Sequence, residues 1–126
     1  MSSSQRNIIT GHNMKILITE SKLERVAINW LNDNYGDLEP YETEEYSDHV
    51  FYRQGKEVIF DYNKKKESVL VNYEEIWSFF EGMFGMGYEQ IQELTKVWVE
   101  GRYNLRVKTV DGVFNKVVER WRNITN

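Results

Sequence analysis

The chain contains no cysteine, one proline and two histidines among its 126 residues. The lack of cysteine excludes disulfide bonds, thiolate metal ligands and a cysteine nucleophile, and it is neutral about the cellular compartment. A histidine-based acid–base reaction can draw only on His12 or His49. These shortages remove several common kinds of metal centre and active site, and no metal ligand set or cofactor motif is predicted.

A net positive charge and long apolar runs are also lacking. The net charge is −4 and the sequence pI is about 5.3, so no overall basic field attracts nucleic acid. No apolar run approaches the roughly 20 residues of a membrane span. Residues 1–7 lack the apolar core of a secretory signal. We therefore expect a cytoplasmic protein that does not enter a membrane, and we do not expect nucleic acid as its main partner.

Aromatic side chains, by contrast, are abundant, at 14% of the residues. A chain of this length fits one domain, and it should bury roughly two-thirds of its unfolded surface. The first 13 residues are polar and show no periodicity, so we predict a disordered extension over 1–13. Ser21 and Glu24 then match the capping box, and apolar side chains repeat at helical spacing as far as Gly36. This pattern predicts a first helix over 21–34.

An acidic connector with the only proline, Pro40, follows over residues 37–49. Three strand-like runs come next, at residues 50–53, 57–62 and 68–72. Their short connections favour an antiparallel meander, because a parallel crossover needs a dozen or more residues. Strand alternation places Val58, Phe60 and Tyr62 on one face of this sheet.

The rest of the chain predicts further helices. They are expected over 73–84, over 88–105, and in a short last segment that carries Phe114, Val117, Val118 and Trp121 on one stripe. Asp111 and Gly112 mark a break before that segment. The predicted fold is α+β, a small three-stranded antiparallel meander with about four helices packed mainly on one face. Residues 14–110 form the α+β domain, and 111–126 form an amphipathic C-terminal helix.

Three segments carry a resemblance to phage proteins. They are residues 14–20 (MKILITE), 71–80 (VNYEEIWSFF) and 88–96 (YEQIQELTK). Together they resemble small uncharacterised proteins encoded by large tailed phages of marine and environmental origin, over roughly residues 14–106. The resemblance implies a phage origin, and hence the host cytoplasm as location. It carries over no catalytic residue.

The acidic connector and His49 are the first candidate for chemistry. Clustered carboxylates could bind a divalent cation, but their spacing fits no calcium loop. A solvated acidic loop is the simpler interpretation. An enzyme would have to use His49 with Glu45 or Asp48, and it would need a cleft around them. A non-catalytic His49 at a strand entrance remains the alternative.

The glycines at positions 82, 85 and 87 invite comparison with a phosphate-binding loop. Such a loop follows a strand and is succeeded by Lys-Ser or Lys-Thr, whereas here a helix precedes and no such pair follows. The pattern favours a tight helix–helix corner plugged by Met83 and Met86, which would form an adaptable contact surface if exposed.

The C-terminal region holds a local excess of positive charge. The basic patch proposed here consists of Arg102, Arg106, Arg120 and Arg122. With nearby aromatic rings it could neutralise and stack on a nucleic-acid strand. Solvated helix faces or a contact with an acidic protein surface explain the same residues.

The aromatic surplus suggests a contact surface, since exposed aromatic patches often mark interfaces. The predicted function is therefore that of a non-catalytic interaction or assembly protein of phage type, which binds a protein partner or self-associates as a homo-oligomer. The alternatives are a small enzyme that uses His49 and a weak nucleic-acid binder. The candidate protein-binding residues are Trp77, Phe79, Met83, Met86, Phe114 and Trp121.

Overall fold

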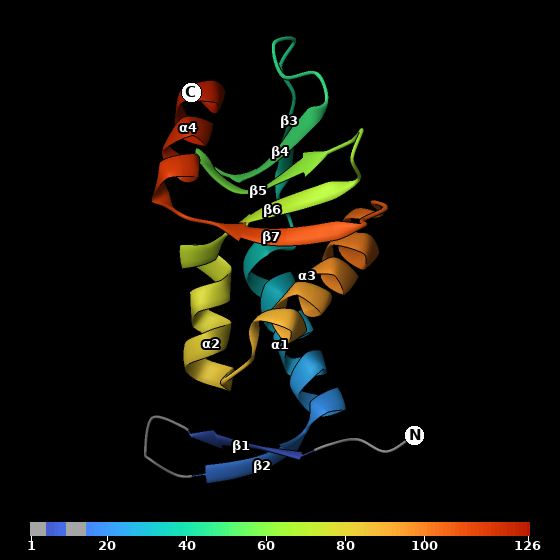
Figure 1. Ribbon diagram of the computed structural model, residues 1–126, viewed down its shortest axis with the longest axis vertical. Helices are drawn as coiled ribbons and strands as arrows, with labels where there is room; N and C mark the ends of the chain where they lie inside the picture. The colour runs from blue at the N-terminus through green and yellow to red at the C-terminus, as the bar shows by residue number, and fades with distance from the viewer. Residues whose placement is uncertain (1–4, 10–14) are drawn as a thin grey trace.

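The computed structural model describes residues 5–9 and 15–126, and it describes the side chains from residue 22 onward. A five-stranded sheet forms the upper half of the molecule in Figure 1, with three helices below it and a fourth helix on its other side. A hairpin of β1 (Gln5–Ile9) and β2 (Lys15–Thr19) lies at the end remote from that sheet. Within the described residues, no helix is long and apolar enough to span a membrane.

The first two predicted elements can be compared with the structure in part. Of the disordered extension predicted over 1–13, residues 5–9 form β1, and the others lie outside the described residues. The predicted helix over 21–34 is confirmed as α1 (Glu20–Tyr35). Its apolar stripe of Leu23, Ala27 and Leu31 is fully buried. The Ser21 side chain, expected to cap this helix, lies outside the described residues.

The sheet is larger than predicted and of mixed direction. Its order is β3 (Glu39–Tyr41), β4 (His49–Gln54), β5 (Glu57–Asn63), β6 (Ser68–Asn72) and β7 (Thr109–Val113). The three predicted strands, β4 to β6, form the expected antiparallel meander. β3 extends it antiparallel beside β4, and β7 extends it parallel beside β6. The α+β class is confirmed, and the count of three antiparallel strands is wrong.

Both missed strands depend on their neighbours. β3 has three residues and contains Pro40, which is tolerated because edge strands leave one row of N–H groups unpaired. β7 contains Asp111 and Gly112, which were interpreted as a break, but both pair with β6. The helices between β6 and β7 supply the long crossover that a parallel pair requires.

The two faces of the sheet carry separate cores. We call the face covered by α1, α2 and α3 the inner face, and the face covered by α4 the outer face. Phe60, Tyr62 and Val69 belong to the inner core, whereas Phe51 and Val58 belong to the outer one. The prediction that Val58 shares a face with Phe60 is therefore wrong. The pairing register shifts between Tyr52 and Arg53, and this irregularity interrupts the alternation of β5.

The middle helices follow the predicted boundaries. A π-helical turn (Tyr73–Trp77) leads directly into α2 (Ser78–Phe84), and α3 runs over Tyr88–Tyr103. The side chain of Asn72 caps the first turn by accepting from the Glu75 N–H at 3.4 Å. The helix–helix corner is confirmed, because Gly85 takes the left-handed conformation and donates its N–H to the Glu81 carbonyl.

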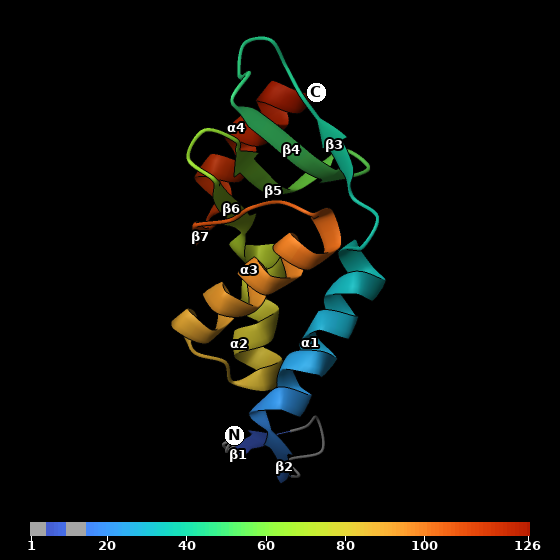
Figure 2. The ribbon, with the colours of Figure 1, turned by 90° about the vertical axis from the view of Figure 1, so that its right-hand side faces the viewer.

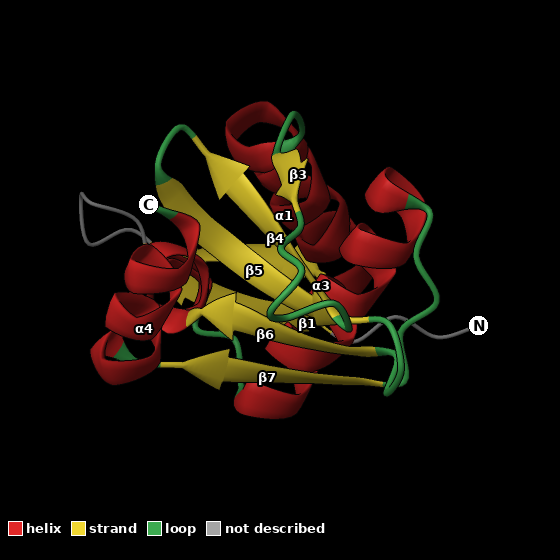
Figure 3. Cartoon of the chain, turned by 90° about the horizontal axis from the view of Figure 1, so that it is seen from above, coloured by secondary structure: helices red, strands yellow, loops and turns green. Residues whose placement is uncertain are grey.

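The last helix, α4 (Asn115–Thr125), departs from the expected packing on one shared face. Val118 and Trp121 pack against Phe51 and Val58, on the sheet face away from the other helices. Figure 3 shows α4 in front of the strands, with α1 and α3 behind them. Figure 2 shows the same separation from the side. The C-terminal helix therefore completes the fold of its own chain.

Candidate functional site

The structure divides the predicted contact residues into buried and exposed groups. Trp77, Met86 and Trp121 are buried in the two cores. Phe79 is half-buried and stacks on Trp30, with ring centroids 4.2 Å apart and planes at 9°. Met83 and Phe114 are 53% and 59% exposed. Met83, Phe114 and part of Phe79 can therefore contact a partner of the folded chain. Trp77, Met86 and Trp121 cannot, because they lie in the interior.

Phe114 belongs to a ring cluster that the sequence did not reveal. Its ring lies 4.7 Å from that of Tyr73, and Tyr73 lies 6.4 Å from the buried Trp77. The ring of Tyr88 also contacts Trp77, edge-on with the centroids 5.2 Å apart, and Tyr88 is 50% exposed. We call Tyr73, Tyr88 and Phe114 the aromatic surface. Its members come from the π-helical turn, the start of α3 and the junction of β7 with α4.

Gly112 fixes how closely β7 approaches this cluster. A Cβ at Gly112 would stand 2.8 Å from Cε3 of Trp77, which is closer than packed atoms approach. Because the indole is buried and also donates to Thr95 Oγ1 at 3.1 Å, it has no room to move aside. The glycine that was interpreted as a break is therefore required for close packing of the strand on a tryptophan.

Both tyrosines of the aromatic surface donate to carboxylates. The Tyr73 hydroxyl donates to Glu81 at 2.6 Å, and this bond is the main cause that raises the pKa of Tyr73. The Tyr88 hydroxyl donates to Asp111 at 3.2 Å. Burial first, and Asp111 second, raise the pKa of Tyr88. Both phenols therefore stay protonated at neutral pH and hold their rings in fixed positions.

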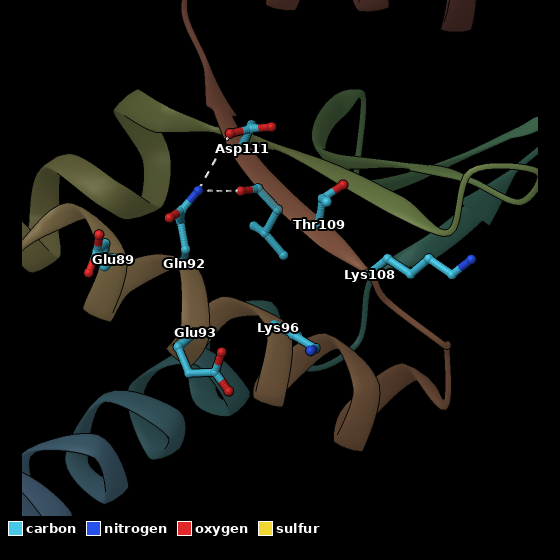
Figure 4. A pocket seen from close by; sticks show the side chains of 8 residues that line it. Glu89, Gln92, Glu93, Lys96, Lys108, Thr109 and Asp111 are labelled. Carbon is cyan, nitrogen blue, oxygen red and sulfur yellow. Dashed lines mark hydrogen bonds between the residues drawn. The ribbon is translucent and has the colours of Figure 1, made fainter.

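A polar cleft lies beside the aromatic surface, between α3 and β7 (Figure 4). Its volume is about 310 Å³, at the lower end of the range for ligand sites. Helix α3 contributes Glu89, Gln92, Glu93 and Lys96, and the chain at β7 contributes Lys108, Thr109, Val110 and Asp111. The four helix residues share one face because they are three or four positions apart.

Charge is unevenly distributed along this cleft. Glu89 and Asp111 lie toward one end, and Lys96 and Lys108 lie toward the other (Figure 4). Lys108 lies 3.5 Å from Glu67. Within the part of the chain that the structure describes, the side chains of Glu89, Glu93 and Lys96 have no ion-pair or hydrogen-bond partner. The cleft therefore offers unpaired charge of both signs.

A second, more apolar groove runs between α1 and α3. It consists of two hollows of about 380 and 350 Å³ that share Ile28 and Val97. Val97 is 52% exposed there. The charged residues that line the groove, Glu24, Arg25, Glu93 and Arg102, carry mixed signs. This groove therefore favours no particular charge on an occupant.

His49 pairs with a carboxylate, although with neither of the two predicted. Its Nδ1 lies 2.8 Å from Oδ1 and 3.0 Å from Oδ2 of Asp61. Asp61 is buried on the neighbouring strand β5, where Phe51 is its direct partner across the sheet. Among the described residues, neither Glu45 nor Asp48, which were expected to assist His49, bonds to it; both are exposed in the connector. The prediction of an adjacent carboxylate partner is therefore corrected to Asp61.

Asp61 orients the His49 ring, because a carboxylate bound at Nδ1 leaves Nε2 as the nitrogen that is free to bind another group. Burial raises the pKa of Asp61, and the hydrogen bond and charge of His49 act against that rise. Neither of these residues lines any of the three hollows described above. One signal in the sequence points to Asp61: it is the one charged residue inside the apolar run of β5, and a buried charge needs a partner.

In the described part of the chain, the acidic connector forms no metal site, and most of the basic patch is paired within the fold. No group of three or more potential metal ligands exists among the described residues. Of the four arginines in the predicted patch, three face acidic side chains, in the pairs Arg102–Asp37, Arg106–Glu67 and Arg122–Glu57. Helix α4 lies at one end of β7 and the C-terminal end of α3 at the other (Figure 1). The four arginines therefore do not form one continuous patch.

Comparisons with protein-family models, with curated proteins and with solved structures found no match for this chain.

Proposed function

We propose that this protein is a non-catalytic interaction or assembly protein of phage type that contacts its partner, or a second copy of itself, through the aromatic surface. The observation that carries this proposal is the exposure of Phe114 and Tyr88, at 59% and 50%, whereas every other aromatic ring of the described residues is buried or half-buried. Aromatic side chains are enriched at interfaces because each buries a large area with few rotatable bonds.

The structure of this surface supports a role in binding. The rings are held in place by one another, by the buried Trp77 and by bonds to Glu81 and Asp111. Little conformational freedom remains to be lost when a partner covers them, so less of the contact energy is spent on ordering. The phage origin rests on the resemblance alone, and with it the host cytoplasm as location.

Self-association is the first property to measure, by sedimentation over a wide range of protein concentration. We expect association that Phe114→Ala weakens by about tenfold or more, because a central aromatic residue contributes over 1 kcal/mol. Val97→Ala is the matched control, since Val97 is 52% exposed but lies on the α1–α3 groove. If the wild type is monomeric, the same two variants are compared in partner capture from a host lysate.

The proposal fails if Phe114→Ala and Tyr88→Ala leave both association and captured partners unchanged. Loss of association in Val97→Ala alone would move the contact to the α1–α3 groove. Point substitutions are preferred to a chain ending at Val110, because that truncation removes three of the five residues of β7 and uncovers Phe51 and Val58.

A small enzyme is the second candidate, and the His49–Asp61 pair is the observation in its favour. In this reading Asp61 orients the ring and Nε2 acts as the base. A hydrolytic activity that disappears in His49→Gln while the fold is retained would support it. Binding of nucleic acid is less well supported, because the four arginines are dispersed and three are paired; steeply salt-dependent binding would be its signature.

A further inference from the structure

The edge of β7 that faces away from β6 has the features of a site for strand addition. Among the strands of the described residues, β7 is the last of its sheet and pairs on one side only, with β6. Seen from above in Figure 3, it forms the margin of the sheet. An unpaired edge presents N–H and C=O groups that can pair with another extended chain. The opposite edge, β3, is shorter and contains Pro40, two features that hinder such pairing.

A side-chain amide already occupies part of this edge. Gln92 of α3 donates its Nε2–H to the backbone carbonyl of Val110 at 2.8 Å (Figure 4). The Val110 carbonyl therefore accepts from a donor outside the sheet, and in a complex the N–H of an added strand would take the place of this amide. A peptide N–H can replace it at little net cost, because one amide hydrogen bond is exchanged for another.

The cleft between α3 and β7 also indicates the chemistry of the added segment. Glu89 and Asp111 mark its acidic end, and Lys96 and Lys108 mark its basic end. Because β7 runs from Lys108 toward Asp111, a segment antiparallel to it would begin at the acidic end and finish at the basic end. Charge complementarity then favours a basic residue near the start of the segment and a carboxylate near its finish.

We propose that the α3–β7 cleft binds an extended peptide segment, antiparallel to β7, with a basic residue at its N-terminal end and a carboxylate at its C-terminal end. Backbone bonds to β7 supply affinity, and the two charged ends supply direction, as in other cases of strand addition. This inference rests on the proposed interaction function and names the chemistry of the partner segment.

The test uses a fluorescent peptide with blocked ends, Arg-Thr-Val-Thr-Val-Glu, whose β-branched residues favour the extended state. Its binding to the full chain is followed by fluorescence anisotropy at low salt, and by amide shifts in NMR spectra. We expect saturable binding that shifts resonances of α3 and β7. The peptide with reversed charges, Glu-Thr-Val-Thr-Val-Arg, should bind about tenfold more weakly, because both pairs become repulsive.

Two sets of variants assign the binding to this cleft. The double variant Lys96→Glu/Lys108→Glu should lose or reverse the preference for the peptide that begins with Arg. Lys65→Glu is the matched charge control, because Lys65 lies on the exposed turn between β5 and β6. This variant should keep the same preference between the two peptides as the wild type. Gln92→Ala should strengthen binding several-fold, because the Val110 carbonyl then becomes free to accept from the peptide.

Methylation of peptide nitrogens separates strand addition from side-chain binding. Successive N–H groups of a strand point to opposite edges, so the peptide is methylated at one alternate set of amides or at the other. One methylated peptide should lose binding and the other should keep it. Equal effects of both, no saturable binding, or a preference for the reversed charges would each overturn the proposal.

These outcomes are separable from those of the proposed function. Peptide binding is read with Phe114 intact, and self-association is read with the cleft intact. Loss of association in Phe114→Ala without any peptide binding would overturn the cleft proposal alone. Peptide binding at the cleft with no role for Phe114 would overturn the aromatic surface alone.

Discussion

The two faces of the sheet differ in how much apolar material covers them. The inner face is sealed by three helices, and its core contains two tryptophans and Phe60. The outer face is covered by α4, and four buried residues form its core. The outer face also holds the buried Asp61 beside His49. Stability should therefore depend mainly on the inner face. The outer face should open locally at lower cost, and through Asp61 it should make stability depend on pH.

The largest effect should come from truncation of the inner core. Phe60 is fully buried and its ring contacts those of Tyr52, Trp98 and Tyr103. Phe60→Ala should lower the free energy of unfolding by about 3–5 kcal/mol, through lost burial and the cavity left behind. Urea denaturation measures this loss. A cost below about 1 kcal/mol would contradict the assignment of stability to the inner face.

The matching substitution on the outer face should cost less and act locally. Trp121 packs on Phe51 and Val58, and α4 is the terminal element. Trp121→Ala should cost about 2–3 kcal/mol, because α4 can detach while the sheet stays folded. Hydrogen exchange should then accelerate in α4 and leave β5 and β6 protected. Equal acceleration in all these elements would show that the two cores unfold as one unit.

A pair of glycine substitutions tests how tightly the inner face is packed. Gly112→Ala places a methyl group against the buried Trp77 and should cost about 1–2 kcal/mol. Gly101→Ala, in α3, meets no atom within 4 Å. It should stabilise the protein by up to about 1 kcal/mol, because alanine favours helix. The two melting temperatures should move in opposite directions; an unchanged or raised melting temperature of Gly112→Ala would contradict the contact with Trp77.

The smallest expected effect is the pH dependence of the outer face. Burial raises the pKa of Asp61 above its ordinary value of 3.8, so the folded chain holds this proton more tightly than the unfolded chain. Protonation therefore favours folding, and that contribution is lost as the pH rises from about 3.8 through the raised pKa. The stability of Asp61→Asn, measured relative to the wild type, should rise over the same window.

A second variant checks the role of His49 in this titration. His49 supplies the hydrogen bond and charge that oppose the rise in the pKa of Asp61. His49→Ala should therefore enlarge the pH dependence, and the double variant with Asp61→Asn should remove it. A pH dependence that is unchanged in His49→Ala would show that the two side chains do not interact in solution.

The helices were predictable because their signals are local. Each carries apolar side chains at a spacing of three or four residues, and Asn72 and Gly85 stand directly before and after the helix predicted over 73–84. Strands β4 to β6 were predictable for a related reason, since short turns separate runs that alternate. In these segments, side-chain periodicity and turn chemistry point to one local conformation.

The sites were harder to predict because they are assembled from distant segments. Asp61 approaches His49 only through the register of β4 on β5. The aromatic surface joins Tyr73, Tyr88 and Phe114 across more than one helix, and it does so over a tryptophan that the sequence suggested as exposed. Neither group of residues recurs at a regular spacing in the sequence, because their separation along the chain is set by the lengths of the segments that connect them.

The sequence by itself determined the α+β class, the four helices and the central meander, because these follow from contacts among near neighbours in the chain. The tertiary structure alone decided that the segment 109–113 is a strand, that α4 covers the opposite face, and which aromatic residues remain exposed. A parallel edge strand is not joined to its neighbour by a short turn, so the sequence around it carries no turn signal that would predict the pairing. Its conformation becomes favourable only when β6 supplies hydrogen bonds and Trp77 supplies a surface that a glycine can approach.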